Sequence, residues 1–431
     1  MKKSNGLLTI LLFVVGTGAI PFGQYAVMAQ DSNYANTPDE IFPYGNFQAP
    51  FYNHFDERLP YLGAAREYET PSDVEKVKIG FIGPLEGAGE YYTMYARQML
   101  QGTRLALEEA NEQGGLNGIP FELITRNDVG LWGASGNELV TLDDEGAIAV
   151  IGSIDGNNTH IAIRVALKLE IPVVNTGSTD PTLTETRIPW LIRTNSDDRQ
   201  FNYALLNEIY NRRGYTRVAV IRANSRYARV GTKEFIAGAT RLGHPVIRQM
   251  VYLPGETDFR DLLERIKAAD VEAVLVWGQV DEAARIVKQM REMNMQQTVF
   301  GSERLVSDRF LELAGESAEG VVATYPYNPH AGNPELERFR QKYMERFGHE
   351  PDNQAVQAYD GTRILIEAIR EAGLNRALIR DELTSIENYE GIAGEIQMDG
   401  SWNNVSQVWL AEIRDGTFEF WPYRWEYLSD N

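Results

Sequence analysis

The chain contains no cysteine, and its five histidines are scattered at positions 54, 160, 244, 330 and 349. The absence of cysteine excludes disulfides, thiolate metal sites, a cysteine nucleophile and a lipid-modified amino-terminal cysteine. The histidines show no spacing, to one another or to carboxylates, that suits a shared metal ion. We therefore expect neither a metal nor any other cofactor.

Basic residues are also in short supply. The chain has 41 Lys and Arg against 61 Asp and Glu, which gives a formal net charge of −20 at pH 7. This charge argues against nucleic acid or an anionic membrane surface as a partner, although it says nothing about the fold. The 431 residues, 43% of them hydrophobic, are enough for two domains with large cores.

An apolar stretch near the start, from Leu7 to Ile20, follows the basic residues Lys2 and Lys3. Small or apolar residues at 27–29 offer a cleavage site, so residues 1–29 are predicted to be a signal peptide. The alternative is an uncleaved anchor, but the run is short and Gly-rich for a bilayer span. A cleaved signal without a lipid-modified cysteine indicates a periplasmic location.

Residues 30–76 differ from the rest of the chain. Their central part, IFPYGNFQAPFYNHFDERLPYLG, is rich in aromatic residues and Pro and has no regular period. A flexible linker would not carry so many aromatic rings, so we expect an extended arm that packs on the main body or on a partner. Disorder of this segment is the alternative.

Alternating strands and helices begin at Val77. VKIGFIG, IPFELITR, AIAVIG and IPVV are predicted strands, and the same rhythm restarts after WLIRTNSDDRQF with RVAVIR, PVIRQMVYL, VEAVLVWG and TVFGSE. Helices at 333–347 and 354–372 follow, and then a strand pair that turns at Asp415 and Gly416. This alternation predicts an α/β protein with two successive units, each a parallel sheet with helices on both faces.

Signatures of catalysis are scarce. Ser153 stands one place too early in the segment 152–156 for a nucleophile elbow. GPLEGAGE lacks both the lysine of a phosphate loop and the glycine spacing of a dinucleotide site. Paired acids such as Glu108 and Glu109 are typical of solvated helix faces. The sequence thus favours a protein that is not an enzyme.

Three loops rich in small residues follow predicted strands, at residues 83–87, 152–158 and 175–180. Each is followed by a helical stretch, whose free N–H groups and positive dipole end favour an anion. Ligands of open parallel sheets bind at the carboxyl ends of the strands, where these loops lie. An ordinary strand-to-helix turn is the alternative for each loop, but three together favour a binding site.

Acidic and aromatic residues add the opposite chemistry. Asp197 lies where the first unit passes to the second, and Glu303 ends TVFGSE, so both acids are candidates for holding an ammonium group. Tyr227 and the segment 277–279 could form an apolar wall with polar tips. Taken singly, each of these residues is also typical of a surface acid or a packed aromatic.

From about residue 77 to residue 419 the chain resembles the type I periplasmic binding proteins of branched-chain amino acid and amide importers, the family of the Leu/Ile/Val-binding protein. The resemblance rests on KIGFIGPLEG, LALEEANEQGGLNGIPFELITRND, AIAVIG, IPVVNTGSTDP, IRTNSDDRQ and TDFRDLLERIKAADVEAVLVWG. It implies two doubly wound, three-layer α/β lobes joined by a three-strand hinge and closing on a ligand. The implied lobes are residues 77–197 plus 326–400 and residues 198–325 plus 401–431, with crossovers near 197–198, 324–327 and 399–404.

The resemblance also implies roles for single residues. Gly177 and Thr179 in the NTGSTDP loop match positions that bind an amino-acid carboxylate. Asp197 and Glu303 match acids that approach the ammonium, and Tyr227 matches a pocket tyrosine. The full set of candidate ligand-binding residues is Gly156, Asn157, Gly177, Ser178, Thr179, Asp197, Tyr227, Gln279, Glu303 and Glu86.

Three of these positions depart from the family pattern. Gly156 stands where a serine binds the carboxylate, Gln279 replaces a pocket tyrosine, and Glu86 replaces a small hydroxyl residue. Three arginines near the cleft edge of the second lobe are candidates for an extra anion or for surface salt bridges: Arg222, Arg226 and Arg229. These departures argue against leucine, isoleucine or valine as the ligand.

Together these features predict an exported solute-binding protein rather than an enzyme. It would capture a small polar solute, an amino acid or a related carboxylate or amide, by lobe closure. It would then deliver the solute to the membrane permease of an ABC importer. A ligand-sensing module that signals to a membrane partner is the alternative, favoured by the aromatic arm. A hydrolase on the same scaffold is a further alternative, without a nucleophile or metal constellation to support it.

Overall fold

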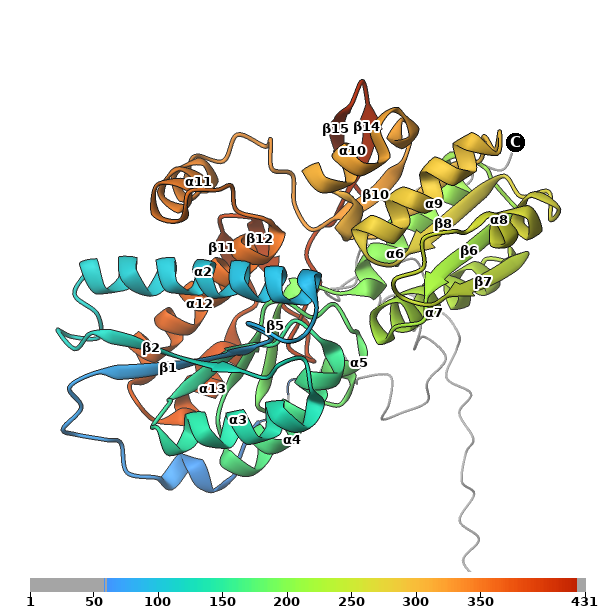
Figure 1. The fold of residues 1–431 in the computed structure, drawn as a ribbon. Helices are drawn as coiled ribbons and strands as arrows, with labels where there is room; N and C mark the ends of the chain where they lie inside the picture. The colour runs from blue at the N-terminus through green and yellow to red at the C-terminus, as the bar shows by residue number, and fades with distance from the viewer. Residues whose placement is uncertain (1–57, 59, 425–431) are drawn as a thin grey trace, which may run out of the picture.

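The computed structural model describes residue 58 and residues 60–424, which form two α/β lobes lying side by side (Figure 1). The predicted signal peptide and arm residues 30–57 lie outside the described residues. Within the described part of the chain, no helix combines the length and the apolar character needed to cross a membrane.

The first lobe is built on a six-stranded parallel sheet with the strand order β13-β5-β4-β3-β1-β2. Its strands are β1 (Val77–Gly83), β2 (Phe121–Asn127), β3 (Ala149–Gly152), β4 (Val173–Asn175), β5 (Leu191–Ser196) and β13 (Asn403–Asn404). The helices are α2 (Glu90–Glu112), α3 (Trp132–Asp144), α4 (Gly156–Leu169), α5 (Thr182–Glu185), α11 (Pro334–Phe347), α12 (Asn353–Ala372) and α13 (Arg376–Ser385). Helices α2 and α12 pack together, as do α3 and α4.

The second lobe has a seven-stranded sheet with the order β15-β14-β10-β9-β8-β6-β7, in which β14 and β15 run antiparallel. Its strands are β6 (Val218–Ala223), β7 (Arg248–Tyr252), β8 (Ala273–Trp277), β9 (Thr298–Gly301), β10 (Val322–Tyr325), β14 (Trp409–Arg414) and β15 (Thr417–Pro422). The helices are α6 (Asp198–Leu206), α7 (Arg226–Arg241), α8 (Arg260–Lys267), α9 (Val280–Glu292) and α10 (Asp308–Ala314).

Both sheets are doubly wound in the same way. The order β2-β1-β3-β4 of the first lobe repeats as β7-β6-β8-β9 in the second, so the chain reverses its winding direction between β1 and β3 and again between β6 and β8. Loops separate at such a reversal, and the crevice at the carboxyl ends of the strands is where sheets of this kind bind ligands. The α/β fold predicted from the sequence is confirmed.

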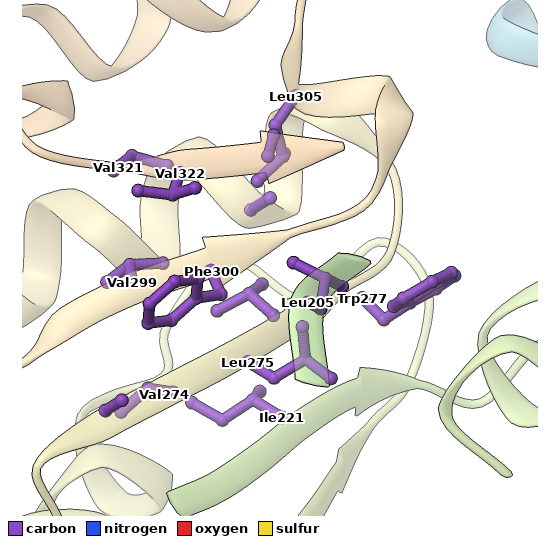
Figure 2. Close-up of a cluster of buried hydrophobic side chains, with 14 of the residues drawn as sticks. Leu205, Ile221, Val274, Leu275, Trp277, Val299, Phe300, Leu305, Val321 and Val322 are labelled. Carbon is purple, nitrogen blue, oxygen red and sulfur yellow. The ribbon is translucent and has the colours of Figure 1, made fainter. Parts of the chain in front are cut away.

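Apolar side chains on both faces of the parallel strands hold each lobe together. In the second lobe, Val274, Leu275, Val299 and Phe300 of the central strands are completely buried and belong to one hydrophobic cluster with Leu205 of α6 (Figure 2). This is why the predicted strands are nearly continuous apolar runs rather than alternating ones.

The strand pair predicted at the end of the chain is confirmed as β14 and β15. Its turn residues Asp415 and Gly416 have φ angles of 50° and 72°, which the Gly adopts without strain. Helix α13 and a two-stranded hairpin, β11 (Asn388–Gly391) with β12 (Gly394–Gln397), were not predicted. Four-residue strands with exposed positions carry too little periodicity to be recognised from sequence.

The chain passes between the two sheets three times, after β5, after β10 and after β13. Because Asn403 and Asn404 pair with β5, this short stretch belongs to the first sheet, and the last crossing follows it. The lobe boundaries inferred from the family resemblance stay predictions.

The described part of the arm packs on the first lobe. Arg58 donates to the carbonyl oxygens of Thr384 (2.8 Å) and Ile386 (3.0 Å), and the ring of Tyr61 lies 4.8 Å from that of Trp190, edge to face. Ala65, in a short 3₁₀ turn, is completely buried against this lobe. These contacts make this stretch an added layer of the lobe's outer surface, away from the other lobe.

We expect this layer to contribute to stability and not to ligand binding. A chain beginning at residue 73 should unfold several degrees below one beginning at residue 58, because it loses these packing and hydrogen-bond contacts. Thermal unfolding and calorimetric titration of both chains test this. Loss of solute binding by the shorter chain, when it is folded, would contradict it.

Candidate functional site

The carboxyl ends of strands from both sheets enclose a small cavity between the lobes, with a volume of about 20 Å³. Its walls are Tyr92, Ile154, Asp155, Gly156, Ser178, Thr179, Asp180 and Asp198 from the segments after β1, β3, β4 and β5, and Arg226, Tyr227, Val230 and Arg304 from those after β6 and β9. This volume accommodates about one water molecule. Side chains or lobes must therefore move before a solute of amino-acid size can enter.

Side-chain hydrogen bonds of Asn175 hold the NTGSTDP loop in place. The Asn175 Nδ2 donates to the carbonyl oxygens of Gly152 at 3.3 Å and Ser153 at 2.8 Å, and its Oδ1 accepts from the Ser178 N–H at 3.1 Å. Asn175 thus joins two of the three loops predicted from the sequence. The third, after β1, is tied to Asn127 instead, whose Oδ1 accepts the Leu85 N–H at 2.9 Å.

Few backbone donors remain free on the first-lobe wall. Asp155 caps α4 by accepting the N–H groups of Asn157 (2.8 Å) and Asn158 (3.2 Å), which are thereby unavailable to a ligand. The N–H groups of Gly156 and Thr179 form no hydrogen bond within residues 60–424. These two groups, at a helix start and in a loop, are suited to an anion.

An ion pair connects the lobes beside Gly156. Arg226 at the start of α7 donates from Nε to the Asp180 Oδ2 at 2.7 Å, and from Nη2 to the Thr182 hydroxyl at 3.1 Å. A Cβ atom on Gly156 would lie 2.7 Å from the Asp180 Oδ2 and 3.2 Å from the Arg226 Nε. Only glycine therefore fits at position 156 when this pair is formed.

The charge of Asp180 is stabilised by the same contacts. Burial opposes ionisation, but hydrogen bonds from Thr182 and the charge of Arg226 outweigh it and lower the pKa of Asp180. The neighbouring His160, whose Nε2 lies 2.8 Å from the Thr182 hydroxyl, has a pKa lowered by burial. The ion pair therefore persists across neutral pH.

Two adjacent acids at the start of α6 have different surroundings. Asp197 caps the helix through the N–H groups of Arg199 and Gln200, each at 2.9 Å, and pairs with the buried Arg193 at 2.8 Å. Asp198 lines the cavity, and neither of its buried carboxylate oxygens has a hydrogen-bond partner within the described residues. Burial, with the charge of Glu303, raises the pKa of Asp198 well above its ordinary value.

A second buried acid, Glu303, lies behind Tyr227. The Tyr227 hydroxyl is 3.0 Å from both carboxylate oxygens of Glu303, and burial raises the pKa of Glu303 despite the opposing charge of Arg304. The Arg304 guanidinium stacks on the Tyr227 ring, with Cζ 3.5 Å from the ring centroid, and its Nε lies 3.6 Å from the Glu303 Oε1. Arginine, tyrosine and carboxylate form one buried cluster on the second-lobe wall.

A family model described as Periplasmic binding protein matches residues 76–417. The chain belongs to the periplasmic binding protein family. An amino acid binding protein from Pseudomonas aeruginosa is 30% identical to it over 312 residues, which cover 69% of this chain and 79% of that protein.

Solved structures share the fold of this periplasmic binding protein. A leucine binding protein, LivK, from Thermotoga maritima superimposes with a TM-score of 0.72 at 25% identity, covering 81% of this chain and 99% of its own. The branched-chain amino acid binding protein LivJ from Streptococcus pneumoniae, solved with isoleucine, gives a TM-score of 0.73 at 23% identity, with the same shares covered.

The structure of this periplasmic binding protein brings only some of the ten candidate residues to the cavity. Four of them line it, namely Gly156, Ser178, Thr179 and Tyr227, and Glu303 contacts Tyr227 directly. The other candidates, which are not among the lining residues, are Asn157, Gly177, Asp197, Gln279 and Glu86. Their roles in ligand binding stay predictions.

The positions of these other candidates have physical reasons. Gly177 packs on α2, where a Cβ atom would lie 2.7 Å from the Met99 Sδ. Glu86 is exposed, and Trp277, predicted to form part of an apolar wall, is completely buried in the core of the second lobe (Figure 2). Gln279 is half-buried just before α9, with its Oε1 lacking a partner in the described chain.

Several charged residues at the cavity were missed or given other roles, among them Asp198, Arg304 and Arg226. Asp198 directly follows the predicted Asp197, and Arg304 directly follows the predicted Glu303. Arg226 was expected to hold an extra anion or a surface salt bridge, and it pairs with the other lobe instead. Asp198 and Arg304 could have been suspected only because each is adjacent to a predicted site residue. Adjacency in sequence does not show which of two neighbouring side chains faces the cavity.

We expect the Asp180–Arg226 pair to favour lobe closure. Arg226→Gln should weaken solute binding about tenfold, because a partly buried ion pair between the lobes is lost. Arg229→Gln, on the exposed face of the same helix, is the matched control and should leave affinity unchanged. Calorimetric titration measures both, and equal affinities for the two variants would contradict the role of the pair.

The two adjacent acids should respond oppositely to amidation. Since the pKa of Asp198 is raised in the folded state, that state retains a proton which the unfolded chain releases, and stability falls as pH rises through this window. Asp198→Asn should therefore raise the solute-free unfolding temperature at pH 8 by a few degrees and leave it unchanged at pH 4. Asp197→Asn should lower it at both pH values, because Arg193 loses its buried partner. Thermal unfolding at the two pH values tests this, and a lower midpoint for Asp198→Asn at pH 8 would contradict it.

Proposed function

We propose that this protein captures a small solute carrying a carboxylate and an ammonium group, an amino acid or a close relative, by closing its lobes around it. The observation that carries the proposal is the presence of both free donors and buried acids at the cavity. The free N–H groups of Gly156 and Thr179 lie at its wall near the buried acid Asp198, and a second buried acid, Glu303, lies behind Tyr227.

The energetics support a zwitterionic solute. The Asp198 carboxyl group is buried without a hydrogen-bond partner in the described chain, so its ionised form is costly unless a cation is bound beside it. An ammonium group would supply charge-assisted hydrogen bonds to it, and a carboxylate would do the same for the free N–H groups. An affinity of ~1 μM needs about 8 kcal/mol, which such a set of interactions can provide.

The relatives support the same class of solute. The Pseudomonas aeruginosa protein is an amino acid binding protein, and the two structural neighbours are leucine and branched-chain amino acid binding proteins. By analogy we infer that this protein acts in the periplasm, delivers its solute to the permease of an ABC importer, and catalyses no reaction.

A thermal-shift screen of the full chain against amino acids, amides, urea and aromatic acids tests the proposal. Only a compound that binds the folded state raises the unfolding midpoint, by about 2.7 kcal/mol of stability at 100 times its Kd. We expect amino acids to raise it and amides without a carboxylate to leave it unchanged. Chemical turnover of any bound compound would overturn the assignment as a binding protein.

The hydroxyl of Thr179 should contribute to carboxylate binding. Thr179→Val keeps the shape of the side chain and removes the hydroxyl, so affinity for carboxylate solutes should fall by about 5- to 10-fold. Thr176→Val is the matched control in the same loop, because the buried Thr176 hydroxyl has no partner within the described residues and does not line the cavity. If calorimetric titration gave both variants the affinity of the parent, the loop would be an ordinary turn.

A further inference from the structure

The guanidinium of Arg304 is a buried cation whose hydrogen-bonding capacity is not used. Its side chain is 5% exposed, it lines the cavity, and its Nε and Nη1 have no hydrogen-bond partner within residues 60–424. Buried polar donors normally have partners, and an arginine has a rigid fork of five N–H donors to satisfy. Two unpaired donor nitrogens at the wall of a binding cavity indicate an acceptor that a ligand supplies.

The protein compensates the charge of Arg304 only in part. Three tyrosine rings surround it, with Cζ at 3.5 Å from the centroid of Tyr227, 5.3 Å from Tyr95 and 5.7 Å from Tyr92. A ring face stabilises a cation without accepting its in-plane hydrogen bonds, and the Nε and Nη1 of Arg304 stay without partners in the described chain. Glu303 approaches only to 3.6 Å, and its two oxygens share the hydrogen of the Tyr227 hydroxyl.

Asp198, the first residue of α6, is a buried acid in the same condition. Both of its carboxylate oxygens lack a hydrogen-bond partner within the described chain, and it lines the same cavity as Arg304. The cavity thus has a guanidinium with two unused donor nitrogens and a carboxyl group without a hydrogen-bond partner in the described chain, besides the free N–H groups assigned above to a carboxylate. A solute that pairs all three has one ammonium and two anionic groups.

We propose that the solute is an acidic amino acid, an α-amino acid with a second carboxylate on its side chain, and that Arg304 pairs with this second carboxylate. The inference rests on the proposed function and narrows its solute class. A planar guanidinium binds a carboxylate through two parallel N–H···O bonds, which an aliphatic side chain cannot replace. An aliphatic solute would leave the donor groups of Arg304 buried and without acceptors. The proposal therefore excludes branched-chain amino acids as solutes.

Entry of such a solute requires Arg304 to move. The cavity accommodates about one water molecule, and the arginine side chain is one of its walls. Rotation about the side-chain bonds of Arg304 would enlarge the cavity and present the fork to the incoming carboxylate. Glu303 would keep its hydrogen bond from Tyr227 while Arg304 rotates, so the rest of the second-lobe wall would stay in place.

Glutamate and glutamine provide the test, since they differ only in the group proposed to meet Arg304. Calorimetric titration of the full chain should give an affinity for glutamate or aspartate at least about 100-fold tighter than for glutamine or leucine. Glutarate, which lacks the ammonium group, should bind weakly, because Asp198 then stays unpaired. In Arg304→Gln, affinity for glutamate should fall by about 100-fold while affinity for glutamine changes little.

Two further variants separate recognition from folding. Arg304→Lys keeps the charge and loses the fork, and should show intermediate selectivity. Arg309→Gln is the matched control, because Arg309 pairs with Asp281 outside the cavity, and its selectivity should equal that of the parent. If Arg304→Gln does not fold, the ratio of glutamate to glutamine affinity in the parent protein decides the matter alone.

The failures of the two proposals are distinguishable. Tighter binding of leucine than of glutamate would overturn the acidic-solute inference and leave amino-acid capture intact. A higher affinity of Arg304→Gln for every amino acid would also overturn the acidic-solute inference, because the Arg304 side chain would then only occupy the space that a solute needs. Absence of binding by every amino acid would overturn both proposals.

Discussion

The buried guanidinium of Arg193 is the interaction on which the arrangement of the two lobes depends. It is completely buried, and its acceptors come from four segments: the carboxylate of Asp197, the side chain of Asn403, the hydroxyl of Thr184 and the carbonyl of Asp180. One cation on β5 therefore holds the start of α6, the strand β13, the helix α5 and the NTGSTDP loop. Loss of any partner would leave part of a buried charge uncompensated, which is far costlier than loss of a surface pair.

This network determines which acid faces the ligand. Asp197 accepts hydrogen bonds from Arg193, from Asn403 and from two N–H groups of α6, which fill its four lone-pair sites and leave none for a solute. The next residue, Asp198, is turned toward the cavity, and its N–H holds the Thr179 carbonyl at 2.8 Å. The hydrogen-bond network around Arg193 thus places at the site a buried carboxyl group that has no hydrogen-bond partner within the described chain. Perturbed acids of this kind cluster where a protein binds or reacts.

Much of the fold and part of the site were predictable from the sequence. Alternating apolar runs and amphipathic helices specified both sheets, and the loops before Gly156 and around Thr179 do line the cavity. The choice between Asp197 and Asp198 was not predictable, because it depends on Arg193, which lies four residues away in sequence but pairs through the fold. Arg304 was missed for a similar reason, since only the 3₁₀ turn after β9 directs it inward.

Gly156 shows how closure and recognition are coupled in this chain. Because residue 156 has no side chain, Asp180 and Arg226 meet across the lobes at the place where a carboxylate-binding hydroxyl would otherwise project. Closure then gains a contact that exists whether or not a solute is present. A ligand shifts the equilibrium between open and closed forms only through interactions that differ between them. Since the Asp180–Arg226 pair would be common to every solute, our proposals assign discrimination to cavity-lining groups that lack hydrogen-bond partners within the described residues, among them Asp198 and Arg304.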